Sequence, residues 1–321
     1  MHPCRTCGRI VGLFREMISL LQRLFTTAGY PSAAAAEPNP HLSRMPSIVY
    51  GTAWKKERTA ELVLAAVRAG FRAVDTACQP KHYHEAGVGD ALAQLASEGI
   101  GRDTLWIQTK FTPLTGQDPK QLPYEQFAPL EQQVAESVAA SKRNLRVECV
   151  DCLLLHSPLP THRDTMRVWR AMEKAVVAGE ACTLGISNCY DATAFRRLCE
   201  DAEVKPAVLQ NRFYQQSGYD VQLREMCKAR GVRYQSFWTL TANPDHIQSE
   251  TVARVATTHG CTPQQAWFAF TMALGITPLS GTTSAEHMRD DVSVAKTVHL
   301  EPDEVQELEK LIRPKGGGWF G

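Results

Sequence analysis

The sequence predicts an α/β protein: a (β/α)8 barrel of the TIM type with one extra helix at its C-terminal end. From Ser47 onward, eight short apolar or β-branched runs alternate, about every 30 to 40 residues, with eight longer stretches of helical periodicity. The first run ends in Gly51-Thr52-Ala53-Trp54, which is not the glycine-rich phosphate turn typical of an open doubly wound sheet. Because alternating strands and helices require a parallel sheet, a closed barrel is the better of the two arrangements.

Each element follows from its own stretch of sequence. The predicted strands are 47–51, 72–75, 104–109, 149–155, 183–186, 207–210, 232–237 and 275–279. The predicted helices are 58–69, 84–97, 129–145, 163–178, 191–201, 219–229, 249–273 and 284–294. A last helix is predicted at 302–312, because Pro302 stands in its first turn, where the missing N–H of proline costs nothing.

The first 44 residues differ from the barrel domain predicted at 45–321. Residues 9–25 carry apolar side chains on one helical face, and residues 31–40 have the composition of a linker. Four arginines against one glutamate in the first 30 residues resemble an organelle transit peptide. Two interpretations stay open: a segment for organelle import, or a disordered extension of a cytoplasmic protein.

Charge and hydropathy exclude several classes of partner. Thirty-five basic residues stand against thirty-four acidic ones, so the net charge favours neither nucleic acid nor an anionic membrane. No uncharged apolar stretch reaches the roughly 18 residues of a membrane-spanning helix. The ten cysteines lie mostly in apolar runs, and the single pair Cys4 and Cys7 lacks the second pair of a zinc site. His82-x-His84-Glu85 likewise lacks further ligands, so we expect no metal.

Polar residues stand where the predicted strands end. In chain order these are Asp75-Thr76, Thr109-Lys110, His156, Ser187-Asn188, Gln210-Asn211 and Phe237-Trp238, with Tyr83 and Glu85 in the loop after the second strand. Each alone has a structural explanation, such as a helix N-cap or a solvated strand end. Reactive groups of such barrels come from the carboxyl ends of several strands, so the combination at one rim indicates an active site.

These residues resemble the aldo-keto reductase family. The matching motifs are Gly51-Thr52, Asp75-Thr76-Ala77, Tyr83 with Glu85-Ala-Gly-Val-Gly89, Thr109-Lys110, Leu153-Leu-Leu-His156-Ser-Pro158, Gly185-Ile-Ser-Asn188 and the strand of Gln210. The resemblance covers about residues 45 to 313 in the correct order. It implies NADPH as cofactor, with NADH less expected, a small carbonyl compound as substrate, and a catalytic tetrad of Asp75, Tyr83, Lys110 and His156. Tyr83 is the only tyrosine in its loop.

The resemblance also implies a cofactor site. Gly51 and Thr52 of the first strand belong to it, Ser187, Asn188 and Gln210 would bind the carboxamide, and Phe237 would stack on the nicotinamide where the family usually has tyrosine. Ser280, Thr282 and Arg289 would contact the adenosine phosphate. Leu279 stands where a lysine is common, and His287 near a common arginine, so NADPH is expected to be preferred only modestly.

The chemistry of the four tetrad residues can be argued independently. A phenol of ordinary pKa about 10 is a weak acid at neutral pH, and an ammonium at Lys110 would lower that pKa. Asp75 would pair with Lys110 and limit the cost of burying a cation. His156 would hydrogen-bond the carbonyl oxygen of the substrate. The predicted function is therefore reduction of an aldehyde or ketone, with Tyr83 as general acid and hydride supplied by the cofactor.

Two other functions remain open on the same barrel. One is a scaffold subunit that senses the cofactor without turnover and resembles potassium-channel β subunits. The other is a hydrolase or aldolase that uses Lys110 as a Schiff base. A monomer is the expected state of the protein.

Overall fold

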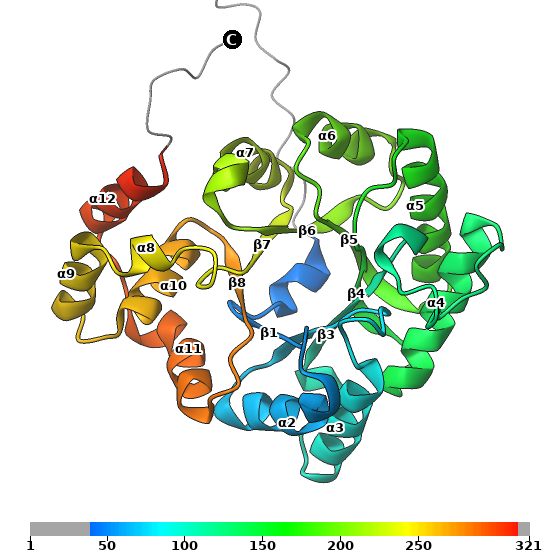
Figure 1. Cartoon of the computed structure of the whole chain (residues 1–321), viewed down its shortest axis with the longest axis horizontal. Helices are drawn as coiled ribbons and strands as arrows, with labels where there is room; N and C mark the ends of the chain where they lie inside the picture. Colours follow the sequence, from blue (N-terminus) through cyan, green and yellow to red (C-terminus); the bar gives the residue numbers. More distant parts are fainter. Residues whose placement is uncertain (1–38, 314–321) are drawn as a thin grey trace, which may run out of the picture. The chain divides into compact units, whose positions relative to one another are not determined.

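The computed structural model describes residues 39–313, and in it eight parallel strands close into a barrel (Figure 1). Each strand pairs with the next along the chain, and β8 pairs with β1. The strands are β1 (Val49–Gly51), β2 (Ala73–Asp75), β3 (Trp106–Phe111), β4 (Val150–Leu155), β5 (Ala181–Ser187), β6 (Pro206–Arg212), β7 (Arg233–Phe237) and β8 (Thr277–Ser280). The predicted barrel is confirmed.

Helices surround the barrel (Figure 1). They are α2 (Thr59–Ala69), α3 (Glu85–Ser97), α4 (Leu130–Leu145), α5 (His162–Val177), α6 (Ala192–Asp201), α7 (Val221–Arg230), α8 (Pro244–Ile247), α9 (Glu250–Thr258), α10 (Pro263–Ala273), α11 (Ala285–Thr297) and α12 (Pro302–Ile312). Short 3-10 helices are η1 (Pro40–Arg44), η2 (Lys56–Arg58), η3 (Arg102–Thr104), η4 (Leu114–Gly116) and η5 (Gln215–Asp220). The extra C-terminal helix is α12, as predicted.

The structure has two helices where the sequence predicts one. The sequence predicts a continuous helix over 249–273, but α9 ends at Thr258 and α10 begins at Pro263. Gly260 between them has a φ of 59°, a conformation that favours glycine. Thr262 then caps α10 through a reciprocal capping box with Gln265. The prediction joined the apolar stretches on either side and overlooked the boundary signals of Gly260 and Thr262-Pro263.

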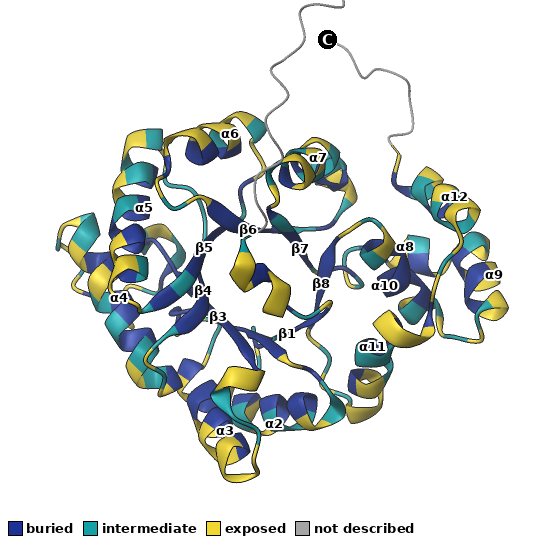
Figure 2. Ribbon diagram, turned by 180° about the vertical axis from the view of Figure 1, so that it is seen from behind, coloured by how far each residue is buried: buried dark blue, intermediate teal, exposed yellow. Residues whose placement is uncertain are grey.

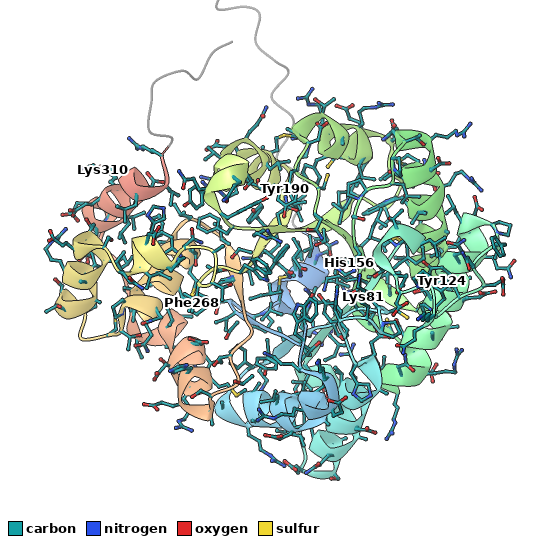
Figure 3. The ribbon with its side chains drawn as sticks, viewed as in Figure 1. Lys81, Tyr124, His156, Tyr190, Phe268 and Lys310 are labelled. Atoms are coloured by element: carbon teal, nitrogen blue, oxygen red, sulfur yellow. The ribbon has the colours of Figure 1, made fainter. Side chains whose placement is uncertain are left out.

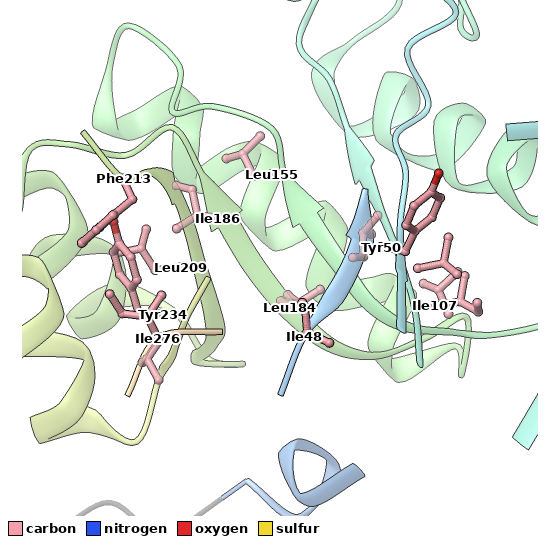
Figure 4. Close-up of a cluster of buried hydrophobic side chains, with 14 of the residues drawn as sticks. Ile48, Tyr50, Ile107, Leu155, Leu184, Ile186, Leu209, Phe213, Tyr234 and Ile276 are labelled. Atoms are coloured by element: carbon pink, nitrogen blue, oxygen red, sulfur yellow. The ribbon is translucent and has the colours of Figure 1, made fainter. Parts of the chain in front are cut away.

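Alternate strand residues face opposite sides of the barrel wall. Ile48, Tyr50, Ile107, Leu184 and Ile276 pack outward in one large apolar cluster with the helices (Figure 4). Figure 2 shows the buried strands enclosed by helices whose outer faces are exposed. The residues between them point inward. This alternation turns Asp75, Lys110, Gln210 and Phe237 toward the interior of the barrel, near the carboxyl ends of its strands.

The amino-terminal end of the barrel is covered by η1, which lies across its centre in Figures 1 and 2. Leu42 and Met45 are buried there and pack with inward residues such as Trp106 and Leu154. The predicted extension of 44 residues therefore ends with a packed element. The amphipathic and linker segments predicted in it lie outside the described residues. Within residues 39–313, no helix is long and apolar enough to cross a membrane.

Candidate active site

A cavity of about 830 Å³ opens at the carboxyl ends of the strands. Most of the predicted site residues line it, namely Gly51, Asp75, Tyr83, His156, Ser187, Asn188, Gln210, Phe237, Ser280 and Thr282. Strand register brings several of them together, because Gly51 lies opposite Asp75 and Ser187 opposite Gln210. Residues from separate parts of the sequence thus meet in one cavity.

A buried ion pair lies beneath this cavity. Lys110 Nζ donates to both carboxylate oxygens of Asp75, at 2.7 and 2.6 Å, and to the carbonyl oxygen of Thr76 at 2.8 Å. Only 1% of the Lys110 side chain is exposed. Burial lowers the pKa of Lys110, and the charge of Asp75 opposes that shift. The pair is arranged as predicted, with the cation fully enclosed by acceptors.

Two buried glutamines donate to the Asp75 carboxylate, and a third glutamine bonds both of them. Asp75 Oδ1 accepts from Gln108 Nε2 at 2.7 Å and from Gln210 Nε2 at 2.9 Å. Gln235 Oε1 accepts from both of these amides, at 2.8 and 2.9 Å. The sequence analysis missed Gln108 and Gln235, although both occupy inward strand positions that a period of two residues would have indicated. These hydrogen bonds, together with those from Lys110, fix the orientation of Asp75.

Tyr83 lies in the loop between β2 and α3, above the ion pair. Its backbone N–H donates to the Gln79 carbonyl at 3.0 Å, which folds the loop back toward the barrel. Lys110 Nζ is 5.2 Å from the centre of the Tyr83 ring. The Tyr83 and His156 rings meet edge to face, with centres 6.0 Å apart. The four predicted tetrad residues are therefore neighbours.

The predicted direction of the Tyr83 pKa is wrong. Burial raises the pKa of the phenol, and the charge of Asp75 raises it further. The physical reason is that burial of the phenol outweighs the attraction of the Lys110 ammonium, whose hydrogen bonds go to Asp75 and to Thr76. A phenol whose pKa lies above its ordinary value of about 10 keeps its proton at neutral pH.

His156 follows β4 and lies near the middle of the barrel mouth (Figure 3). Burial lowers the pKa of His156 to about 3, and the charges of Lys110 and His82 contribute. Its Nδ1 is 2.7 Å from the hydroxyl of Thr112. A neutral ring that accepts from Thr112 at Nδ1 carries its own proton on Nε2. That tautomer presents a hydrogen-bond donor.

We predict that His156 makes the protein less stable in acid. The unfolded histidine has a pKa of about 6.5, so between about pH 3 and 6.5 the unfolded chain binds a proton that the folded chain does not. The free energy of unfolding therefore falls as pH falls through this window, by up to about 1.4 kcal/mol per pH unit. Denaturant unfolding of His156→Gln, measured at several pH values in this window, should show a smaller slope of the free energy of unfolding against pH.

The comparison with His156→Gln isolates this one group, because every other titrating residue is common to both proteins. His299→Gln is the matched control, since His299 is exposed. Equal slopes for the unmodified protein and His156→Gln would contradict a neutral, buried His156.

The amides and hydroxyl predicted for the nicotinamide surround one wall of the cavity. Ser187 Oγ donates to the Gln210 carbonyl at 2.8 Å, and Asn188 Nδ2 donates to the His156 carbonyl at 2.9 Å. Asn188 has a φ of 51°, which asparagine tolerates better than most residues. Phe237 lines the same cavity. The strand ends thus place polar groups beside an aromatic face.

The other end of the cavity is acidic. Glu286, His287, Asp290 and Asp291 line it. Ser280 Oγ donates to Asp291 Oδ2 at 2.6 Å, and burial raises the pKa of Asp291 to about 6.

Three predicted residues do not line the cavity. Lys110 lies beneath it, and Thr52 is buried with its hydroxyl donating to the Asp75 carbonyl at 2.9 Å. Arg289 is exposed on α11 and is not brought to the cavity, because a helix turns successive residues to different faces.

Two cations that line the cavity were missed by the sequence analysis. Lys55 follows β1, and its Nζ donates to the Gly281 carbonyl. Arg212 ends β6. Their positions just after or at strand ends are the signal that could have identified them.

Comparison with known proteins places the chain in a family. Residues 47–244 match the profile of the aldo/keto reductase family. The chain is 26% identical over 317 residues to a D-galacturonate reductase of Fragaria ananassa, covering 90% of this chain and 93% of the relative. It is 27% identical over 270 residues to the methylglyoxal reductase DkgB of Salmonella typhi, covering 79% and 90% of the two chains.

Solved structures share the fold. An aldo-keto reductase from a Medee basin deep-sea metagenome library superposes with a TM-score of 0.71 at 21% identity, over 86% of this chain and 94% of that one. A Bombyx mori aldo-keto reductase in complex with NADP has a TM-score of 0.69 at 20% identity, over 83% and 89%. The closed barrel and the match over residues 47–244 agree, and the chain belongs to the aldo/keto reductase family of oxidoreductases.

Proposed function

We propose that the protein reduces an aldehyde or ketone to an alcohol, with NADPH as hydride donor and Tyr83 as general acid. One observation carries the proposal: Tyr83 and His156 line a single cavity directly above the buried pair of Lys110 and Asp75. The names of two relatives, a D-galacturonate reductase and a methylglyoxal reductase, support a small carbonyl compound as substrate.

Tyr83 would donate the proton. Its raised pKa keeps the phenol protonated, and the proton transfers as the carbonyl oxygen gains negative charge. The Nε2–H of neutral His156 would hydrogen-bond the same oxygen and orient it. The Lys110 ammonium beneath the ring would stabilise the phenolate that forms. Asp75 keeps this ammonium in place through two hydrogen bonds.

The cavity fits a nicotinamide dinucleotide. Its polar groups from Ser187, Asn188 and Gln210 stand beside the aromatic face of Phe237, an arrangement suited to a flat ring that carries an amide. When bound, the nicotinamide supplies the hydride. Lys55 reaches Gly281 across the cavity rim and would add a positive charge near the phosphates. The Bombyx mori relative solved with NADP supports this cofactor class.

The preference for NADPH over NADH is expected to be small. Ser280 and Thr282 would face the 2′-phosphate, but Glu286 and Asp290 line the same end and repel a dianion. We predict that Asp290→Asn strengthens NADPH binding several-fold relative to NADH, measured as dissociation constants by fluorescence titration. Asp245→Asn, on exposed α8, is the control. An unchanged ratio would place the phosphate away from Asp290.

A steady-state assay tests the proposed function. NADPH oxidation would be followed at its absorbance band with a panel of aldehydes and ketones. Cofactor binding without turnover would favour the cofactor-sensing scaffold. Trapping of a substrate on Lys110 by borohydride, without nicotinamide binding, would favour the Schiff-base alternative. Turnover that requires the nicotinamide supports the reductase.

We further propose that the protein works as a monomer, because the described residues of a single chain close the barrel and line its cavity. Gel filtration with light scattering tests this. Fusion of residues 1–44 to a fluorescent reporter tests whether the protein is cytoplasmic or imported into an organelle.

A further inference from the structure

Arg212 is a cation placed against aromatic rings inside the cavity. It ends β6 opposite Phe237 of β7 and lines the cavity wall. Its guanidinium carbon lies 4.0 Å from the centre of the Trp238 ring, 5.0 Å from that of Tyr214 and 5.8 Å from that of Phe237. The backbone N–H of Arg212 donates to the Tyr190 hydroxyl at 3.1 Å, which anchors the residue. The side chain is therefore held in one place.

The guanidinium of Arg212 has no counter-ion among the described residues. Its Nε is buried without a hydrogen-bond partner, and no carboxylate within residues 39–313 forms an ion pair with it. By contrast, Arg170 pairs with Glu173 at 2.8 Å and with Glu203 at 3.0 Å. Aromatic faces attract a cation but do not accept the in-plane N–H groups of a guanidinium. A cation held this way inside a binding cavity is suited to an anion supplied by a ligand.

We propose that Arg212 binds an anionic group, a phosphate or a carboxylate, of a molecule in this cavity. The proposal rests on the proposed function, which puts a dinucleotide and a carbonyl compound there. The anion then has two sources: the diphosphate of the cofactor or a carboxylate on the substrate. The rings of Trp238 and Tyr214 hold the guanidinium, so its N–H groups are preorganised for two parallel hydrogen bonds.

The variants Arg212→Gln and Arg212→Lys test this assignment. The glutamine removes the charge, whereas the lysine keeps it without the planar fork. Arg196→Gln is the matched control, because Arg196 is exposed on α6. Dissociation constants are measured for NADPH, NADH, inorganic pyrophosphate and benzoate. Values of kcat/KM are measured at saturating NADPH for 4-carboxybenzaldehyde and for the uncharged 4-nitrobenzaldehyde.

The two sources give different results. If Arg212 holds the diphosphate, Arg212→Gln weakens the binding of NADPH, NADH and pyrophosphate alike by about tenfold or more. The ratio of kcat/KM between the two aldehydes, measured at saturating NADPH, then stays unchanged. If it holds a substrate carboxylate, the cofactors bind as before, and kcat/KM falls about tenfold only for 4-carboxybenzaldehyde. In either case Arg212→Lys should lose less affinity or kcat/KM than Arg212→Gln. If the glutamine variant does not fold, the lysine variant alone provides the test.

The proposal would be overturned if Arg212→Gln and Arg196→Gln gave the same dissociation constants and the same kcat/KM with every ligand. Arg212 would then be a packing residue. The proposed function is tested separately, by turnover of 4-nitrobenzaldehyde with the unmodified protein. Without that turnover, the binding of pyrophosphate and benzoate still decides whether Arg212 is an anion site.

Discussion

Tyr83→Phe is expected to abolish nearly all reductase turnover while NADPH still binds. The substitution removes the hydroxyl that would protonate the substrate oxygen, but it keeps the ring that packs above Lys110 and beside His156. The measurements are kcat with a reactive aldehyde and the dissociation constant of NADPH. More than a few per cent of residual activity, a loss of less than roughly 2 kcal/mol of barrier, would show that Tyr83 is not the acid.

A second tyrosine provides the control for Tyr83→Phe. Tyr234 is buried and donates to Asp220 at 2.9 Å on the outer side of the barrel wall. Tyr234→Phe also loses one hydroxyl and one hydrogen bond, so stability should fall while turnover per folded molecule is retained. If both variants lose turnover equally, the loss reports damage to the fold rather than to the chemistry.

Lys110→Met is expected to cause a comparable loss of turnover, together with a changed pH profile. Without the ammonium, nothing beneath the ring stabilises the phenolate of Tyr83. Burial lowers the pKa of Lys110, so raising the pH through that lowered value removes its charge in the unmodified protein. The alkaline decline of kcat that follows should be absent from the variant. An unaltered pH profile would contradict the role of the charge.

The same variant should also be less stable. It leaves the Asp75 carboxylate buried without its cation, and breaking a buried pair costs about 3–5 kcal/mol. Donation from Gln108 and Gln210 reduces that cost without removing it. Thermal melting therefore accompanies the kinetic assay, and only the folded fraction is counted. Lys174→Met, at an exposed position on α5, is the control.

The barrel could be predicted because its signal is local. The alternation of apolar runs and helical stretches follows from the periods of strands and helices, so the order of eight strands emerged without tertiary information. The break between α9 and α10 also has a local signal, because Gly260 stands after the first helix and Thr262-Pro263 begins the second, but the prediction joined two helices that both bury apolar faces.

The sequence alone also determined that polar residues from several strands gather at one end of the barrel. Asp75, Lys110, His156 and Gln210 stand at or near strand ends, and parallel strands bring such ends to one rim. Only the tertiary structure decided the electrostatics among them. Burial of the phenol and the charge of Asp75 raise the pKa of Tyr83, whereas the Lys110 ammonium directs its hydrogen bonds to Asp75 and Thr76.

The direction of the side chain decided whether other charged residues reach the cavity. Arg289 was predicted at the phosphate, but its position on α11 leaves it exposed, while Arg212 turns into the cavity against Trp238. Residue type and spacing predict which element a charge belongs to. Whether that charge meets a ligand, a carboxylate or solvent depends on packing between elements distant in the sequence, and its energy changes steeply over a few ångströms in a medium of low dielectric.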